Sequence, residues 1–382
     1  MRIAFVSGTF FPQPGGAQVQ THNICNKLKE KNCEIDCYIF NKTDIKNNNY
    51  NILLINKFLI SFVYFFRYYL NINLNFIIKI YLKKIIISKK YKVWHFIFLN
   101  SKCLILIDCL TQLNQKVIVT FQGADIQIDK SINYGFRLNK FYELYLKKII
   151  GKIDHFFYIS QTIKQDLLNL SVPEEKMSYN PNSVEIEKFQ KFEKKNKLNK
   201  TINLITVARY SSKKKGFDIL LDLSKILIEK NIDFKWTIVG KNTKKLLDFE
   251  IIKQNIKFFN IIENIENTDE TYFPHSQLIK YYIVSDIYVN CSRIESFGIT
   301  FIEALAANLP VVTFNSKGAN EIVKNNFNGY IVNNNSELID KIIDLYKNPN
   351  QISDIKNNLL DSIKKYDLNL ATNKILDTNR FL

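Results

Sequence analysis

Two glutamates near the C-terminal end, Glu295 and Glu303, are separated by seven residues in the run Glu295-Ser-Phe-Gly-Ile-Thr-Phe-Ile-Glu303. Ser296 is a suitable N-cap and Gly298 permits close approach of the backbone, so the run predicts a helix that begins near Phe297. The N–H groups at a helix start attract phosphate. Glu295 would then lie on the loop beside this anion site, and Glu303 about one and a half turns into the helix. One carboxylate can accept hydrogen bonds from sugar hydroxyls and the other from ribose hydroxyls. The alternative is a helix with a solvated glutamate at each end.

A second group of candidate residues follows a strand predicted over 202–208. Arg209 stands where this strand ends, and Lys215-Gly216 precedes a helix predicted from about Phe217. A planar guanidinium and an ammonium that converge at one strand end can hold a diphosphate. The alternative is a run of solvated lysines on a loop. The expected position facing the Glu295 helix start favours a binding site.

Paired glycines, Gly15-Gly16, lie between the first predicted strand and the first predicted helix. Such a turn lets the main chain approach a phosphate or a sugar closely, although a plain turn is an equal alternative. The spacing is not Gly-x-Gly-x-x-Gly, which argues against an oxidoreductase.

Predicted strands and helices alternate along the chain, which indicates parallel sheets of the α/β class. The strands are predicted over 3–7, 33–40, 93–97, 116–120, 155–160, 202–208, 235–240, 256–259, 286–292 and 310–314, with a helix over 17–31 after the first.

A charged stretch over 187–200 has no sustained apolar face and is the predicted linker, with a hinge near residue 195. The sequence therefore predicts two doubly wound, Rossmann-like domains facing across a cleft, because ligands bind beyond the carboxyl ends of such strands. The predicted boundaries are an N-terminal domain over 1–190, a C-terminal domain over 200–365, and a last helix over 366–382 that returns to the first domain.

Positive charge is concentrated in one part of this 382-residue chain, whose net charge is +17. Residues 45–107 contain ten Lys or Arg and no Asp or Glu, and their apolar runs are too short to cross a bilayer. Basic residues interleaved with aromatics suit an anionic membrane surface. A solvated basic face over a packed helix pair is an equal alternative, and a nucleic-acid surface ranks below both because no nucleic-acid motif accompanies the charge.

The residues that commonly bind metals form no recognisable motif. The six cysteines lack paired metal spacing, the four histidines are scattered, and no Asp-x-Asp occurs. We therefore expect free thiols in a reducing cytosol, no metal and no other cofactor.

In their order along the chain, these motifs resemble the family-4 retaining glycosyltransferases of GT-B architecture. The resemblance covers nearly the whole chain and is extended by further motifs at 120–125, 160–164, 181–185, 318–321 and 328–332. It departs from the family at Gln122, where a histidine is usual, and at Ser183, where glycine is more common. Gln122 can hydrogen-bond a sugar hydroxyl but cannot transfer a proton as histidine does.

The resemblance implies roles for individual residues. Arg209 and Lys215 would bind the diphosphate of the donor, and Glu303 its ribose. Glu295 would bind the transferred sugar, together with the backbone near Phe297 and Gly298. The implied catalytic residues are Arg209, Lys215 and Glu295. The implied donor-binding residues are these three with Gly16, Gln122, Phe297, Gly298 and Glu303.

The function implied is transfer of a hexose, with retained configuration, from a nucleoside-diphosphate sugar to a hydroxyl of a glycan or lipid-linked glycan. This activity fits the synthesis of surface polysaccharide or lipopolysaccharide by an enzyme that is cytoplasmic or peripheral on the inner membrane face, docked through 45–107. A nucleotide-sugar epimerase or hydrolase would instead form product without an acceptor. A non-catalytic glycan-binding scaffold would show negligible turnover of the donor.

Overall fold

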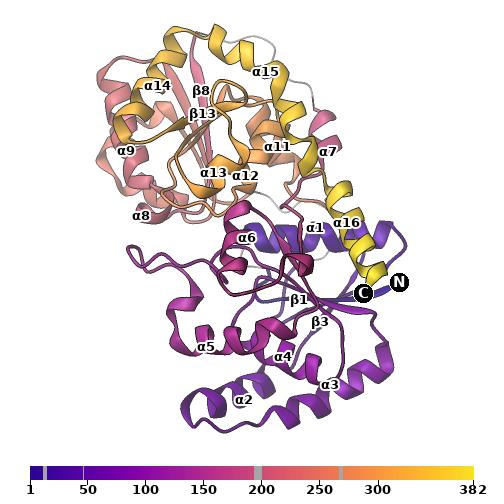
Figure 1. Cartoon of the computed structure of the whole chain (residues 1–382). Helices are drawn as coiled ribbons and strands as arrows, with labels where there is room; N and C mark the ends of the chain where they lie inside the picture. Colours follow the sequence, from indigo (N-terminus) through magenta and orange to yellow (C-terminus); the bar gives the residue numbers. More distant parts are fainter. Residues whose placement is uncertain (12–14, 46, 193–199, 266–269) are drawn as a thin grey trace. The chain divides into compact units, whose positions relative to one another are not determined.

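The chain forms two compact units in a computed structural model that describes residues 1–11, 15–45, 47–192, 200–265 and 270–382. Unit 1 comprises Met1–Asn182, Thr271–Phe273 and Leu368–Leu382, and unit 2 comprises Ser183–Glu270 and Pro274–Asp367 (Figure 1). The predicted hinge near residue 195 and residues 193–199 of the predicted linker lie outside the described residues, and the start of that linker forms the helix Ile186–Gln190.

Unit 1 is built on a seven-stranded sheet in the order β3-β2-β1-β4-β5-β6-β7, in which all neighbours are parallel. Its strands are β1 Arg2–Ser7, β2 Glu34–Ile39, β3 Asn51–Leu54, β4 Val93–Ile97, β5 Val117–Thr120, β6 His155–Tyr158 and β7 Met177–Tyr179. The central strands are apolar at successive positions because helices cover both faces of a parallel sheet. The strand order reverses between β1 and β4, where Phe5 pairs with His95.

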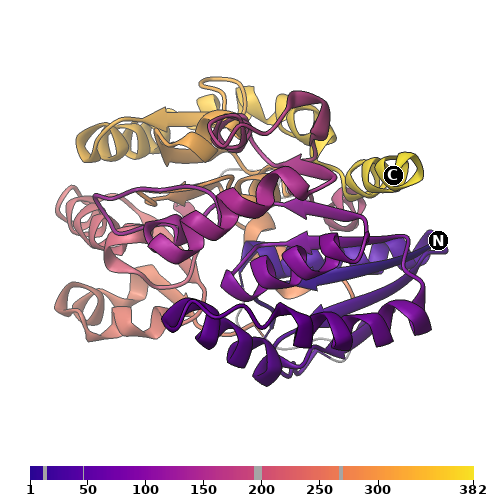
Figure 2. The same ribbon diagram turned by 60° about the horizontal axis from the view of Figure 1, so that its bottom comes forward.

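The helices of unit 1 lie on both faces of this sheet (Figures 1 and 2). They are α1 Gly16–Glu30, α2 Lys57–Tyr69, α3 Asn75–Lys89, α4 Ser101–Gln112, α5 Lys140–Ile149, α6 Gln161–Leu168 and α16 Leu368–Phe381. The C-terminal helix α16 packs beside α1 and adds Leu368 and Ile375 to the core of unit 1. The short segment Thr271–Phe273 is held by α1, where Asn23 Nδ2 donates to the Phe273 carbonyl at 2.8 Å.

Unit 2 repeats the architecture with six parallel strands in the order β10-β9-β8-β11-β12-β13. The strands are β8 Ile202–Val207, β9 Phe234–Val239, β10 Phe259–Ile262, β11 Ile287–Asn290, β12 Val311–Phe314 and β13 Gly329–Val332. The helices are α7 Ile186–Gln190, α8 Ser212–Lys215, α9 Phe217–Glu229, α10 Glu250–Gln254, α11 Ser276–Ile283, α12 Ile299–Ala306, α13 Lys317–Ile322, α14 Asn335–Lys347 and α15 Asn350–Ile363. The prediction of two doubly wound domains with parallel sheets is confirmed.

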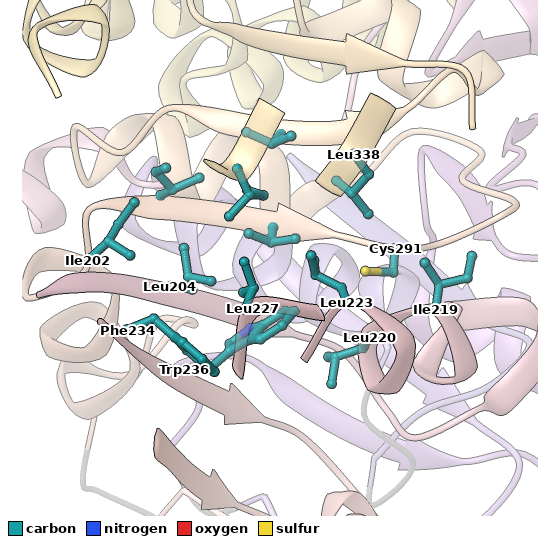
Figure 3. Close-up of a cluster of buried hydrophobic side chains, with 14 of the residues drawn as sticks. Ile202, Leu204, Ile219, Leu220, Leu223, Leu227, Phe234, Trp236, Cys291 and Leu338 are labelled. Atoms are coloured by element: carbon teal, nitrogen blue, oxygen red, sulfur yellow. The ribbon is translucent and has the colours of Figure 1, made fainter. Parts of the chain in front are cut away.

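The core of unit 2 lies between its sheet and the helices α9 and α14 (Figure 3). Trp236 on β9 is fully buried there beside Leu223 and Leu227 of α9. Its indole N–H donates to Thr206 Oγ1 at 3.1 Å, so this large ring is buried without leaving a polar group unpaired. This packing fixes β8, whose carboxyl end carries the candidate site.

The strand predicted over 256–259 is wrong. Ile256–Phe258 form a 3-10 turn, and the strand is β10, which begins where the predicted one ends. Phe258 stacks on Phe234 with ring centroids 4.9 Å apart. Phe258 thus packs on the core from outside the sheet, whereas Ile256 is exposed, although the sequence of the turn looks like that of a strand.

Candidate functional site

The switch point of unit 2, where strand order reverses between β8 and β11, carries most of the predicted site residues. Arg209 follows β8, and Glu295 follows β11 on the next loop. Ligands of open α/β sheets bind beyond the carboxyl ends of the strands at such a reversal. The two predicted groups of residues therefore come from adjacent strand ends of one sheet.

Gly216 allows the two loops to approach each other closely. It ends α8 in the left-handed conformation, with φ of 65°, and α9 begins at Phe217 as predicted. A Cβ atom on Gly216 would lie 1.9 Å from the carbonyl oxygen of Cys291, which follows β11. A residue with a side chain would push the lysine-rich loop away from the loop that carries Glu295.

Basic side chains gather where these loops meet. Lys215 Nζ lies 2.7 Å from Glu295 Oε2, and the exposed fractions of the two side chains are 21% and 17%. Burial lowers the pKa of Lys214, and the charges of Lys215 and Arg209 lower it further against the opposing effect of Glu295. Arg209 itself is exposed to solvent. The site thus carries a net positive potential that suits a diphosphate.

Arg293 connects the loop after β11 to the lysine-rich loop, and no local sequence pattern predicts this role. Its guanidinium forms two bonds to the carboxylate of Asp218, at 2.8 and 2.7 Å, and donates to the carbonyl of Lys213 at 2.9 Å. The hydrogen bonds from Arg293 lower the pKa of Asp218. Arg293 therefore ties the loop after β11 to α8 and to the first turn of α9.

The helix of the two-glutamate run begins two residues later than predicted. α12 starts at Ile299, and its N-cap is Gly298, with φ of 92°, rather than Ser296. The loop persists this far because the Gly318 N–H donates to the Glu295 carbonyl at 2.8 Å, and because Gly298 adopts a left-handed conformation that suits glycine. No side chain caps the helix, so its N-terminal N–H groups stay available for an anion.

Phe297 contributes only its backbone to this loop. Its side chain is buried and packs edge-on against Tyr366, with ring centroids 5.6 Å apart. This placement agrees with the expectation that the backbone, and not the ring, faces a ligand.

Glu303 is a buried carboxylate just over one turn into α12. Tyr282 on α11 donates to its Oε2 at 2.9 Å. Burial raises the pKa of Glu303 to about 7, and the Tyr282 hydrogen bond offsets only part of that effect. Among the described residues, Oε2 is the only carboxylate oxygen of Glu303 with a hydrogen bond to another side chain. A buried acid with acceptor capacity to spare is typical of a ligand-binding position.

In unit 1, Gly16 is the first residue of α1 and is exposed. It follows β1, which lies at the switch point of its own sheet. Gly15 is the N-cap in an extended conformation, and no side chain caps the helix.

Gln122 lies on the loop after β5, and its amide pairs with that of Asn182. Gln122 Nε2 donates to Asn182 Oδ1, and Asn182 Nδ2 donates to Gln122 Oε1, both at 3.0 Å. Each amide has two N–H groups and two acceptor positions, so half of the capacity of Gln122 remains for a ligand. No local sequence pattern predicts that Asn182 is its partner.

The buried side chain of Asp125 stabilises the loop after β5. Its carboxylate accepts hydrogen bonds from the backbone N–H groups of Gln122, Gly123 and Leu99 at 2.8 to 3.2 Å. Burial raises the pKa of Asp125 to about 6, although these bonds oppose the shift. Within the described parts of the chain, no group of His, Cys, Asp and Glu residues is placed to hold a metal ion.

The structure therefore brings Lys215 and Glu295 into contact. Arg209 lies close enough for its charge to act on the neighbouring Lys214. Gly298 is the N-cap of α12, the helix that follows Glu295, and Glu303 lies within that helix. Gly16 and Gln122 belong to unit 1 and are positioned by its own strands.

Solved structures share this fold along the whole chain. A glycosyltransferase from Rickettsia africae superposes with a TM-score of 0.76 at 20% identity, covering 99% of this chain and 97% of its own. The Anabaena protein HepE, solved with UDP and glucose, gives a TM-score of 0.74 at 14% identity and covers both chains fully. These structures show that the two parallel-sheet units of this chain have the GT-B fold.

Two family models together match residues 14–360. Glycosyltransferase Family 4 matches 14–188, and Glycosyl transferases group 1 matches 187–360. The chain belongs to these glycosyltransferases, and the prediction of a family-4-like glycosyltransferase of GT-B type is confirmed.

Curated relatives come from the synthesis of cell-surface glycans and glycolipids. The α-monoglucosyldiacylglycerol synthase of Streptococcus pneumoniae is 24% identical over 90% of this chain and 78% of its own length. The CapM capsular polysaccharide biosynthesis glycosyltransferase of Staphylococcus aureus is 27% identical over 59% of this chain and 60% of its own. The α-monoglucosyldiacylglycerol synthase of Acholeplasma laidlawii is 27% identical over 58% of this chain, and the chain spans about half of its length, 52%.

Proposed function

We propose that the protein transfers a hexose from a nucleoside-diphosphate sugar to a hydroxyl of a glycan or lipid-linked glycan, with retained anomeric configuration, in surface polysaccharide or lipopolysaccharide assembly. The observation that carries the proposal is the cationic cluster at the β8–β11 switch point, in contact with Glu295 and next to an uncapped helix start. The names of the relatives support the choice of acceptor class.

The donor diphosphate would be held by Arg209 and Lys215. Glu295 orients the Lys215 ammonium through one hydrogen bond, which leaves two of its three N–H groups for phosphate oxygens. The backbone N–H groups at Gly298 and at the start of α12 would take another oxygen.

The two glutamates would bind the two sugars. Glu295 can accept a hydrogen bond from a hydroxyl of the transferred hexose through the oxygen that does not face Lys215. Glu303 would accept from the ribose, and the ligand would then supply the hydrogen bonds that this buried carboxylate lacks. The roles of Gly16 and Gln122 in binding donor or acceptor stay predictions.

In the chemical step, the bond between the anomeric carbon and the diphosphate oxygen breaks as the acceptor oxygen bonds to that carbon on the same face. The transition state resembles an oxocarbenium ion, and negative charge grows on the departing diphosphate. The acceptor proton passes to a phosphate oxygen of the donor. Arg209 and Lys215 stabilise this growing charge, and loss of one such preorganised donor typically costs about 3–4 kcal/mol. No cofactor takes part.

The test is turnover of UDP-glucose and GDP-mannose with a panel of glycan and glycolipid acceptors, followed by NMR of the product anomer. UDP-glucose is tried first because HepE was solved with UDP and glucose. Lys215→Ala should lower turnover by roughly a hundredfold. The matched control is Lys244→Ala, on an exposed turn of the same unit.

Each other result identifies a competitor. Product formed from donor without acceptor would indicate an epimerase or a hydrolase. Product of inverted configuration would refute retention. Absence of turnover with all donors and acceptors would leave a glycan-binding scaffold, and equal activity of Lys215→Ala and Lys244→Ala would refute the assigned site.

A further inference from the structure

Helix α2 presents a row of aromatic side chains to solvent. Phe58, Phe62, Phe65 and Tyr69 recur at spacings of four, three and four residues, which places them on one face of a helix. Their exposed fractions are 79%, 48%, 49% and 65%. The opposite face carries the buried residues of the helix, Ile60 and Val63. The aromatic row therefore points away from the core of unit 1.

Helix α3 repeats the pattern with basic residues added. Phe76, Ile80, Lys83 and Ile87 share one face at the same spacings, and all four are exposed. The buried residues Asn75, Ile78 and Leu82 lie on the other face. Lys84, also exposed, lies beside the row. We refer to the outward residues of both helices, Phe58, Phe62, Phe65, Tyr69, Phe76, Ile80, Lys83, Lys84 and Ile87, as the α2–α3 face.

A buried polar network anchors α3, and α2 packs against α3 and α4. The two helices contact each other and α4, on the side of α4 away from the sheet (Figures 1 and 2). Asp108 on α4 accepts hydrogen bonds from Asn75 of α3 at 3.1 Å and from Tyr145 of α5 at 2.8 Å, and it pairs with Lys152 at 3.0 Å. Burial raises the pKa of Asp108, but these bonds outweigh that effect and lower it. The carboxylate stays ionised, and the α2–α3 face is anchored.

Charge identifies the partner of this face. Its sequence surroundings, residues 45–107, contain ten basic residues and no acidic one. Two copies of the face would bring like charges together, which disfavours a dimer through it. A nucleic acid would leave Ile80 and Ile87 without a suitable contact. Aromatic and aliphatic side chains interleaved with lysines match the boundary of an anionic bilayer, where rings enter the headgroup region and ammonium groups meet lipid phosphates.

We propose that the α2–α3 face docks the protein on an anionic membrane surface, with the rings of α2 inserted and the lysines of α3 at the headgroups. Among the described residues, no helix is long and apolar enough to cross a membrane. The docking is therefore a surface attachment in which both helices lie in the plane of the interface. It does not depend on the proposed transferase activity.

The first test is flotation of the whole protein with vesicles of equal parts phosphatidylglycerol and phosphatidylcholine, compared with phosphatidylcholine alone. The protein should float with the anionic vesicles, and high salt should weaken this binding. The double variant Phe62→Ser, Phe65→Ser should lower the bound fraction roughly tenfold, because the inserted rings supply the apolar burial. Lys83→Gln, Lys84→Gln should lower it several-fold on anionic vesicles only.

Matched controls come from exposed positions elsewhere. Phe381→Ser removes a ring that is 91% exposed on α16 of the same unit. Lys244→Gln, Lys245→Gln removes the same charge from an exposed adjacent pair in unit 2. Both controls should float as the unchanged protein does, and thermal unfolding should verify that every variant is folded.

A tryptophan variant tests whether the α2–α3 face inserts into the membrane while its aromatic character is kept. The two native tryptophans, Trp94 and Trp236, are buried and supply a constant background. Phe65→Trp should shift its fluorescence to the blue with anionic vesicles and should be quenched by brominated lipid, whereas Phe381→Trp should do neither.

Three results would overturn the proposal. These are no flotation at low salt, equal binding to neutral and anionic vesicles, and flotation unchanged in both the aromatic and the lysine variants. A concentration-dependent dimer that Phe62→Ser, Phe65→Ser abolishes, without any vesicle binding, would assign the face to a second copy instead.

Discussion

The two units share their strand order through six strands, but they differ in what their strand ends carry. At the switch point of unit 2, Lys215 contacts Glu295 and charged groups cluster. In unit 1, Gln122 on the loop after β5 forms a neutral amide pair with Asn182, which follows β7. The fold alone therefore does not assign the chemistry. Side chains placed on the loops do so.

The two units also differ in how a buried carboxylate is hydrogen-bonded. Asp125 in unit 1 and Glu303 in unit 2 both have raised pKa values, about 6 and about 7, because both are buried. Asp125 accepts hydrogen bonds from three backbone N–H groups, two on its own loop and that of Leu99 after β4. Glu303 has the single hydrogen bond from Tyr282 among the described side chains. Asp125 thus serves the structure, whereas Glu303 keeps capacity for a ligand.

The largest expected effect comes from removing the guanidinium at the switch point. Arg209→Ala should lower kcat/KM for the donor by about 100- to 1000-fold, because a preorganised cation at the departing diphosphate is lost. The control is Arg380→Ala, which removes an exposed arginine from unit 1 and should change kcat/KM less than about twofold. Steady-state kinetics with varied donor measures both. Comparable losses of kcat/KM in Arg209→Ala and Arg380→Ala would show that the effect is not specific to the switch point of unit 2.

Replacing each of the two carboxylates by an amide should change the free energy of unfolding at pH 8 by a different amount. The folded pKa of Glu303 lies above its ordinary value of 4.5, so between about pH 4.5 and 7 the folded state keeps a proton that the unfolded state has released. Ionisation in the fold therefore costs stability as pH rises, up to about 3 kcal/mol above pH 7 at 1.36 kcal/mol per unit. Glu303→Gln should raise the free energy of unfolding at pH 8 and leave it unchanged near pH 4.

Asp125→Asn removes a similar penalty at pH 8, because burial also raises the pKa of Asp125, but it places an amide N–H against backbone N–H donors, which costs about 1–3 kcal/mol. The two effects oppose each other, so Asp125→Asn should raise the free energy of unfolding at pH 8 less than Glu303→Gln does. Urea unfolding at the two pH values measures each variant. Destabilisation by Glu303→Gln at pH 8 would contradict the interpretation that the Glu303 carboxylate binds a ligand rather than stabilising the fold.

The same pKa predicts how donor binding depends on pH. If Glu303 binds the ribose as proposed, its ionised carboxylate accepts stronger hydrogen bonds from the ribose hydroxyls than the protonated form does, so affinity for UDP should fall as pH drops below about 7. In Glu303→Gln the affinity should be weaker at pH 8 and nearly constant between pH 6 and 8. Calorimetric titration with UDP provides the measurement. Equal pH dependence in both proteins would exclude Glu303 as the responsible group.

Glycines in the two units provide a smaller test. Gly216→Ala should destabilise unit 2 by at least about 2 kcal/mol, because alanine is strained at φ of 65° and its Cβ would meet the Cys291 carbonyl oxygen. Gly151→Ala in unit 1 is the control, since a Cβ there has no neighbour within 4 Å. Thermal unfolding compares them, and a similar Tm in both variants would show that the two loops of the switch point can separate easily.

The sequence was most informative at the centres of the two sheets and least at their edges. The central strands β1, β4, β8 and β11 have continuous apolar runs and were predicted within a residue or two. The strands that were missed or misplaced, β3, β7, β10 and β13, are the four edge strands. The edge strands β3, β7 and β10 contain exposed or partly exposed positions, so their apolar pattern is weaker than that of the buried central strands.

The candidate site shows the same limit for a different reason. Arg209, Lys215 and Glu295 were predictable because each follows a strong strand or lies in a distinctive run. Their supports were not, since Arg293 meets Asp218 across 75 residues and Tyr282 meets Glu303 from another helix. Such pairings are created by the fold and leave no local pattern.

The smallest expected effect concerns the amide pair that unit 1 has in place of charge. Gln122→Ala and Asn182→Ala should each destabilise the protein by about 1 kcal/mol, since each leaves the other amide with unmade hydrogen bonds. The double variant should cost less than the sum of the two, because the second substitution removes a partner that is already unpaired. A double-mutant cycle in urea measures the coupling. Strict additivity would mean that the two amides act independently and that Gln122 is free to face a sugar, whereas coupling identifies Asn182 as the residue that positions it.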